Sequence, residues 1–279
     1  MRGGLALLGA LLVGACAPAA PKVQPSRIIS LNPCTDALLV ELADRDQIGA
    51  LSSYSRDPSQ SSMDVGRART YPFTLGTMEE VVASQPSLVV SGSFTPAATR
   101  AAYARMGLRL EEFSMAATVE ESEGQIRRMA ALLGHPERGE AMIARIDQTM
   151  REASPLHGAK PLPALIWQGG GLVVGGETLV SDLLRRTGFT PFAAIRGMGQ
   201  SQFLPLERMV VDPPRVLLVI GHGDADGGRE GRRVLGHPVL AQLRTMQRFD
   251  FDASLEYCGG PTIIRAAQRL AQIRREVHP

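Results

Sequence analysis

Two cysteines and their neighbours are the residues best suited to chemistry in this sequence. Cys34 and Cys258 each lie in a short polar run that follows a predicted strand. Two such thiols could form a disulfide, act as soft thiolate ligands of iron or cobalt, or lie buried as small apolar groups. A disulfide is our hypothesis, and it requires the fold to bring the two ends of the chain together. Asn32 and Tyr257, in the same two runs, are further candidates for contacting a ligand.

Other polar clusters lack the spacing that known metal or catalytic sites require. The loop His222–Asp226 contains hard ligands, but it lacks the full spacing and the terminal glutamate of a calcium loop. We therefore predict no metal site, although His222 or Asp224 could contact a ligand from that loop. The glycine-rich runs Gln168–Gly171 and Gly175–Gly176 match neither nucleotide-binding fingerprint. No HExxH motif and no Ser-His-Asp order occurs, so the sequence does not predict an enzyme.

Composition indicates a globular protein of about two domains. The chain has 279 residues, of which 44% are hydrophobic and 21% are charged, and its formal net charge is +2. It contains no clustered basic segment with interleaved aromatic residues, which argues against nucleic-acid binding.

The N-terminus resembles a bacterial lipoprotein signal. Leu5–Val13 is an apolar stretch of signal-peptide length that is too short to span a bilayer. The small residues before Cys16 resemble a lipobox, in which the cysteine is lipidated and becomes the new N-terminus. A cut after Ala17 is the alternative, but Pro18 would then follow it. We expect residues 1–16 to be a signal peptide and residues 17–26 a proline-rich tether, with the protein anchored in the periplasm or at the cell surface.

The elements that must position the candidate residues show an internal repeat. Thr77–Gly92 has the pattern of a short amphipathic helix, a proline break and a buried strand. The same pattern returns at Pro205–Gly221, with Glu79 corresponding to Glu207. A repeated helix–strand unit predicts two similar lobes.

Strands alternate with helices on both sides of a long helical segment, which predicts an α/β fold with mostly parallel sheets. We predict strands at 27–31, 48–51, 88–90, 108–113, 164–167, 172–174 and 248–251. Thr118–Ala153 keeps helical spacing except at Gly134–Pro136, and a continuous helix of that length would reach about 54 Å. We therefore expect an N-terminal lobe at 27–117, a connecting helix at 118–153 and a C-terminal lobe at 154–279.

Taken in order, these features resemble the helical-backbone class of substrate-binding proteins of ABC importers, which bind cobalamin, ferric siderophores or haem. The resemblance covers nearly all of the mature chain. It rests on the repeat and on three motifs: Ser52–Ser55, Met78–Glu79 with Pro86–Val90, and Ala266–Leu270. It implies a monomeric carrier with no cofactor of its own and an ABC permease in the inner membrane as its partner. The enzymatic alternative is a two-lobed chelatase or nitrogenase-like protein.

The resemblance also implies roles for particular residues. Glu79 and Glu207 correspond to glutamates, one in each lobe, that pair with arginines of the permease. Tyr54, Phe73 and Trp167 correspond to aromatic residues that face the cleft in the cobalamin-binding members, where flat rings can stack on a macrocycle. The ligand is expected to lie between the lobes, at the carboxyl ends of the strands.

The sequence departs from those members at four positions. Gly92 and Ser201 stand where they carry further tryptophans, and Arg186 and Ala271 stand where they carry disulfide cysteines. The expected ligand is a cobalt- or iron-containing chelate. A corrinoid is favoured, with a ferric siderophore or haem as the alternative.

Overall fold

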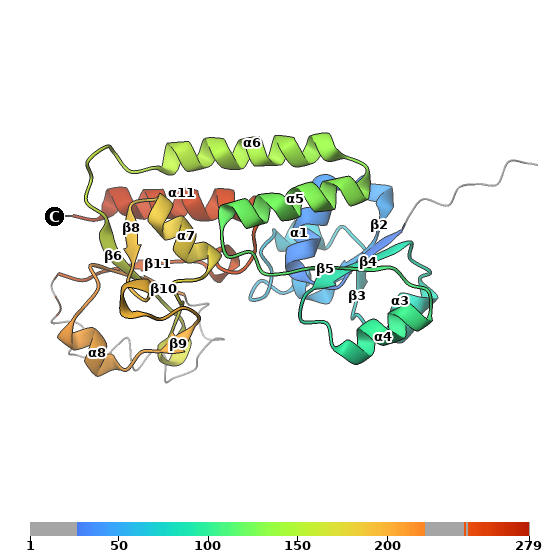
Figure 1. Cartoon of the computed structure of the whole chain (residues 1–279), viewed down its shortest axis with the longest axis horizontal. Helices are drawn as coiled ribbons and strands as arrows, with labels where there is room; N and C mark the ends of the chain where they lie inside the picture. The colour runs from blue at the N-terminus through green and yellow to red at the C-terminus, as the bar shows by residue number, and fades with distance from the viewer. Residues whose placement is uncertain (1–26, 221–242, 244, 279) are drawn as a thin grey trace, which may run out of the picture.

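The computed structural model describes residues 27–220, 243 and 245–278, which form two α/β lobes side by side beneath a layer of helices (Figure 1). The predicted signal peptide, the tether, Cys16 and the His222–Asp226 loop lie outside the described residues. Within the described ranges, no helix is long and apolar enough to cross a membrane.

The N-terminal sheet is parallel throughout and has the strand order β3-β2-β1-β4-β5. Its strands are β1 (Ile28–Ser30), β2 (Ile48–Ser52), β3 (Phe73–Thr74), β4 (Leu88–Gly92) and β5 (Leu110–Phe113). The helices of this lobe are α1 (Pro33–Leu42), α2 (Val65–Ala68), α3 (Met78–Ala83) and α4 (Ala97–Arg105). Successive strand residues face opposite sides of the sheet, so Ile28 joins the large core under the helical layer, whereas Ile29 joins a small cluster with α3 and α4.

The C-terminal sheet is mixed but mostly parallel. Its order is β11-β10-β6-β7-β9, with β8 paired to β6; β7 is antiparallel to both β6 and β9, and the other described pairs are parallel. The strands are β6 (Leu162–Trp167), β7 (Leu172–Val173), β8 (Phe189–Pro191), β9 (Gln202–Phe203), β10 (Val216–Val219) and β11 (Gln247–Asp250). The helices are α7 (Leu179–Arg186), α8 (Leu206–Val211) and α11 (Pro261–Glu276).

The connection between the lobes consists of two helices that fold back on each other. α5 (Val119–Leu133) ends at Gly134, whose φ of 80° allows the left-handed turn, and α6 (Pro136–Ala153) begins with a proline at its first position. The break predicted at Gly134–Pro136 therefore reverses the chain, and the segment does not extend as one straight helix. α5 and α6 run side by side over the lobes (Figure 1), and Gly139 allows a close approach because a Cβ there would lie 2.8 Å from that of Ala130.

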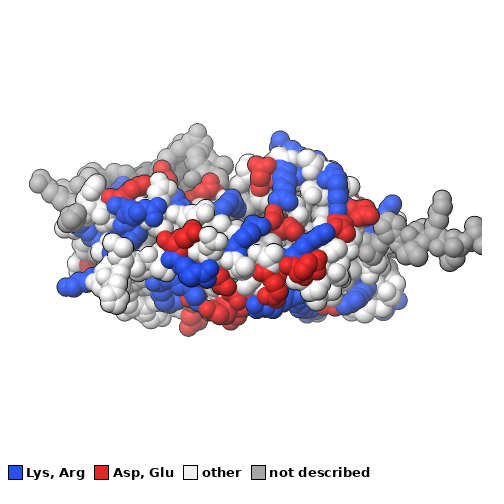
Figure 2. Space-filling model, turned by 90° about the horizontal axis from the view of Figure 1, so that it is seen from above, with Lys and Arg blue, Asp and Glu red and all other residues white. Residues whose placement is uncertain are grey.

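One hydrophobic core spans both lobes. It contains Val90 of the N-terminal sheet, Leu218 of the C-terminal sheet, and the buried faces of α1, α5, α6 and α11. The outer surface of this helical layer carries acidic and basic side chains intermixed, with no extended region of one sign (Figure 2). The layer therefore serves to join the lobes and shows no preference for a strongly charged partner.

Candidate functional site

A cleft of about 850 Å³ lies between the lobes, at the carboxyl ends of the parallel strands. Residues at or after the ends of β1, β2, β4 and β5 form one wall, and residues that follow β6, β10 and β11 form the other. This is the edge at which open α/β sheets place their ligands. The predicted cleft between the lobes is thus present.

The cleft lining is uncharged within the described part of the chain. Its polar groups are amides and hydroxyls, contributed by Asn32, Gln60, Gln125, Gln168 and six serines. Its apolar surface includes Tyr54, Phe94, Phe113, Met115, Leu172, Ile220 and Tyr257. No Asp, Glu, Lys, Arg or His of the described residues lines it. Such a surface suits a ligand with a broad apolar body and a neutral periphery that donates and accepts hydrogen bonds.

Tyr54 is positioned by a buried carboxylate that the sequence did not single out as functional. It lies in a short 3₁₀ turn (Ser53–Arg56) after β2, is half exposed, and lines the cleft. Asp36 of α1 accepts hydrogen bonds from the Ser52 backbone N–H at 3.1 Å and from the Ser55 hydroxyl at 2.6 Å. Burial raises the pKa of Asp36 to about 6, despite these hydrogen bonds. The carboxyl group therefore fixes the loop that presents Tyr54.

A second buried carboxyl group lies behind the opposite wall. The Gln168 amide nitrogen donates to Glu256 Oε1 and lies 3.4 Å from the Tyr257 hydroxyl. Burial raises the pKa of Glu256 to about 7, against the opposing effect of hydrogen bonds from Gln168 and Tyr257. Gln168 and Tyr257 both line the cleft, so Glu256 holds two groups that a ligand would contact.

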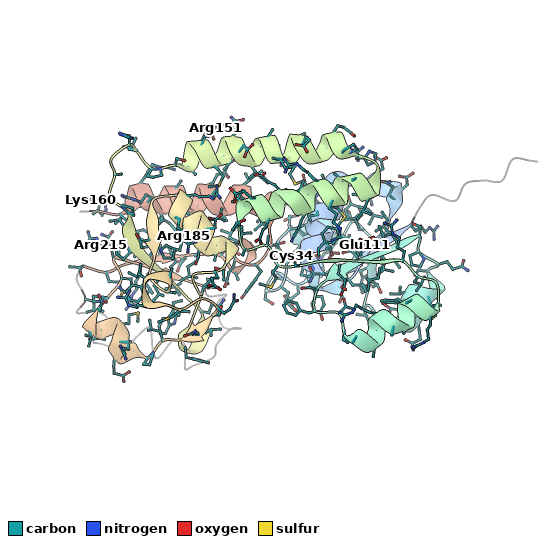
Figure 3. The ribbon with its side chains drawn as sticks, viewed as in Figure 1. Cys34, Glu111, Arg151, Lys160, Arg185 and Arg215 are labelled. Atoms are coloured by element: carbon teal, nitrogen blue, oxygen red, sulfur yellow. A yellow bond between two sulfur atoms is a disulfide. The ribbon has the colours of Figure 1, made fainter. Side chains whose placement is uncertain are left out.

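A disulfide joins Cys34 and Cys258 where the two lobes meet (Figure 3). It links the start of α1 to the segment before α11, with a Cα–Cα distance of 5.1 Å, and both cysteines line the cleft. The next residues are tightly packed, because the Gly260 N–H donates to the Ser122 hydroxyl of α5 at 2.8 Å. Of the three possibilities that the sequence left open, the structure shows the disulfide, which leaves neither thiol to coordinate a metal.

Three of the five predicted ligand contacts come together in the cleft: Asn32, Tyr54 and Tyr257. Asn32 also caps α1, since its side chain accepts from the Cys34 N–H at 2.9 Å. Gln168 is a further cleft residue that was not among the predicted contacts. The sequence contained a signal for Gln168, because this residue comes directly after the buried strand β6. Asn32 has a similar place shortly after the end of β1.

The structure places Trp167 and Phe73, both predicted to contact the ligand, outside the cleft lining. Trp167 is only 1% exposed and packs with Leu165 and Leu217 on the face of the sheet turned away from the helical layer. Strand alternation explains this, because Leu165 and Trp167 share one face of β6 while Ile166 takes the other. Phe73 is half exposed outside the cleft, where the guanidinium of Arg56 lies 3.9 Å from its ring centroid.

Glu79 and Glu207 lie outside the cleft lining, on equivalent helices. Each is the exposed second residue of a six-residue helix, α3 in one lobe and α8 in the other. Both helices lie on the side of the molecule away from α6 (Figure 1). The described residues contain no group of three or more His, Cys, Asp or Glu side chains that could hold a metal ion.

Comparison with known proteins places this geometry in a family. The family described as periplasmic binding protein matches residues 28–249. The chain belongs to the periplasmic binding protein family. Proteins of this family are carriers, so the chain is not an enzyme, and membership implies a periplasmic location. The chelatase or nitrogenase-like alternative is therefore set aside.

The chain is similar to a vitamin B12-binding protein of Photorhabdus laumondii, with 25% identity over 256 residues that cover 89% of this chain and 87% of the relative. Solved structures of the same fold include the periplasmic heme-binding protein HutB of Vibrio cholerae, with a TM-score of 0.71, 18% identity, and coverage of 89% and 98%. The vitamin B12-binding protein BtuF of Vibrio cholerae matches with a TM-score of 0.68, 17% identity, and coverage of 91% and 98%. These likenesses support the two-lobed fold.

Proposed function

We propose that this periplasmic binding protein captures an uncharged metal chelate, with a corrinoid favoured, and delivers it to an ABC permease. The observation that carries the proposal is the neutral lining of the cleft, which pairs amide and hydroxyl groups with exposed aromatic rings. A ligand with free carboxylates would gain from cationic partners, and the described lining offers none. The vitamin B12-binding relative supports the same ligand class.

Tyr54 and Tyr257 favour haem or a ferric siderophore as the second candidate. Both side chains line the cleft and are about half exposed. A tyrosine phenolate is a known protein ligand of haem iron, so either residue could approach an iron centre. Several heme-binding periplasmic proteins share the fold, so a protein of this architecture can bind haem.

Calorimetric titration with cyanocobalamin, hemin and a ferric hydroxamate tests the ligand. We expect cyanocobalamin to bind with micromolar or tighter affinity, and Tyr54→Ala to weaken it about fivefold, since aromatic stacking is worth about 1 kcal/mol. Phe73→Ala is the matched control and should change the affinity less than twofold, because Phe73 lies outside the cleft. Binding of hemin alone, with an absorption band that Tyr54→Phe or Tyr257→Phe removes, would instead establish the haem candidate.

We propose that delivery uses Glu79 and Glu207, one from each lobe. Two carboxylates at equivalent points of two lobes suit a partner with two-fold symmetry that presents a cation on each half. Reversing both charges, with Glu79→Arg and Glu207→Arg, should abolish uptake of radiolabelled cobalamin by cells and leave the calorimetric affinity unchanged. A loss of cobalamin affinity in this variant would count against the docking role.

We also keep the lipid anchor on Cys16 as a proposal. The mass of the N-terminal peptide released from membranes tests it, because a diacylated cysteine and an unmodified one differ by the mass of the lipid.

A further inference from the structure

Each lobe presents an exposed apolar side chain at the same point of the internal repeat. Leu75 is 67% exposed and Phe203 is 73% exposed. The offset between these two residues equals the offset between Glu79 and Glu207. Each apolar side chain therefore stands four residues before a proposed docking glutamate. The repeat in the structure is longer than the helix–strand pattern in the sequence, because a short strand precedes the helix in both lobes. The unit β3-α3-β4 corresponds to β9-α8-β10.

The two lobes fix these side chains by different means. The Leu75 N–H donates to Glu80 Oε2 at 2.8 Å, and the Thr74 hydroxyl donates to the same oxygen at 2.6 Å, which ties the turn to the first part of α3. These hydrogen bonds also lower the pKa of Glu80, that from Thr74 most of all. Phe203 is held instead by pairing of β9 with β7, where it lies opposite Leu172. An exposed apolar residue is thus kept at one place by two unrelated local structures.

Neither side chain serves the cleft or the core. Leu75 and Phe203 do not line the cleft, and neither belongs to a hydrophobic cluster of the described residues. A single exposed apolar residue is ordinary on a protein surface. A matched pair beside a matched pair of acids is different, and α8 adds Val211, which is 84% exposed. Leu75 and Glu79 thus form one patch, and Phe203, Glu207 and Val211 form the other. α3 and α8 both lie on the side away from the helical layer, so one partner could reach both patches (Figure 1).

Charge and symmetry identify the kind of partner. A second copy of this chain that paired these patches two-fold would bring glutamate toward glutamate, which is unfavourable. A two-fold membrane permease with one cation beside one apolar hollow on each half would complement both patches at once. The shared core of the two lobes keeps the patches at a fixed separation, as a two-point contact requires.

We propose that Leu75 and Phe203 are apolar anchors, one in each lobe, that enter hollows on the two-fold permease beside the cations that pair with Glu79 and Glu207. The inference rests on the proposed delivery function and adds a hydrophobic component to it. Buried apolar anchors supply binding energy at the centre of an interface, whereas charges mainly set orientation and association rate.

The test compares Leu75→Ser/Phe203→Ser with Leu156→Ser. Leu156 is 86% exposed and lies between α6 and β6, so its replacement removes one exposed apolar side chain outside both patches. Binding of each cobalamin-loaded variant to the cell's cobalamin permease in nanodiscs is measured by surface plasmon resonance. Cobalamin affinity and thermal unfolding are measured in parallel. We expect the double variant to bind the permease at least tenfold more weakly, mainly through faster dissociation, with cobalamin affinity, melting temperature and the Leu156→Ser control unchanged.

Two further measurements separate the outcomes. If Glu79→Arg/Glu207→Arg abolishes permease binding while Leu75→Ser/Phe203→Ser leaves it intact, the apolar anchors are refuted and the proposed delivery stands. If neither variant affects permease binding, the permease does not contact this face of the protein. Both the proposed docking role and the apolar anchors are then refuted. Sedimentation velocity addresses a second copy as occupant, because a dimer in the wild type that the double serine variant dissociates would overturn the proposal.

Discussion

Glu256 shows how a single buried group can affect the cleft without facing it. Its side chain is 7% exposed, and Oε2 has no hydrogen-bond partner among the described residues. A carboxylate in such a place is poorly solvated, which is why burial raises its pKa to about 7 from the ordinary value of 4.5. The Glu256 carboxyl group accepts hydrogen bonds from Gln168 and Tyr257, so its protonation state affects how these two cleft residues are positioned.

Glu256→Gln should remove a pH-dependent component of stability. The folded protein keeps the Glu256 proton up to a pH of about 7, whereas the unfolded chain releases it near 4.5, so the folded state binds more protons between these values. Stability from this group is therefore present below pH 4.5 and is lost as the pH rises through 7. Urea unfolding at pH 5 and pH 8 should show wild type losing up to about 3 kcal/mol relative to Glu256→Gln.

Glu152→Gln is the control for this experiment, because Glu152 is an exposed carboxylate near the end of α6 that accepts a hydrogen bond from the amide of Gln148. It should not reproduce the relative change between pH 5 and pH 8. A wild type and a Glu256→Gln variant whose stabilities change in parallel with pH would show that Glu256 titrates near its ordinary value.

At the scale of single elements, the sequence predicted what periodicity and turn chemistry determine. The strands at 48–51, 88–90 and 164–167 follow from apolar runs, prolines and glycines that act locally. β3, β8 and β9 were missed because they have only two or three residues and form through pairing with neighbours. Local propensity carries little information about such pairs.

The connecting segment and Trp167 show what local patterns leave open. The sequence located the break at Gly134–Pro136, but the reversal of direction follows from apolar stripes on α5 and α6 that bury each other. Trp167 stands next to Gln168 at the end of β6, and one step along a strand moves a side chain to the opposite face of the sheet. The sequence placed this strand end at the cleft, but the register that turns Trp167 inward depends on the assembled sheet.

At the scale of the whole molecule, two features restrain the opening between the lobes. The first is the core beneath α5, α6 and α11, which includes buried residues from both sheets. The second is the Cys34–Cys258 disulfide where the lobes meet, close to the Gly260–Ser122 hydrogen bond. A shared core resists opening because every degree of rotation would expose apolar surface. We therefore infer that the core is the main restraint on opening. The disulfide mainly stabilises the contact between the start of α1 and the segment before α11.

Cys34→Ser/Cys258→Ser separates these two contributions. A disulfide that closes so long a loop restricts the unfolded chain, so its removal should lower the free energy of unfolding by about 2–5 kcal/mol. The radius of gyration from small-angle X-ray scattering should stay unchanged, since the core still joins the lobes. Cyanocobalamin affinity should fall only slightly, through loss of the sulfur surface that lines the cleft. Adding a thiol reductant should affect the wild type and leave the double variant as it was.

The contrary outcome would reassign the restraint. If the double variant expands in solution and binds cyanocobalamin much more weakly, the disulfide sets the separation of the two cleft walls. The shared core alone would then be insufficient to keep the lobes together. A preformed cleft would then depend on an oxidising compartment, which agrees with a periplasmic location. If the variant loses stability alone, the cleft is preformed by packing, and its lining side chains determine which chelate is retained.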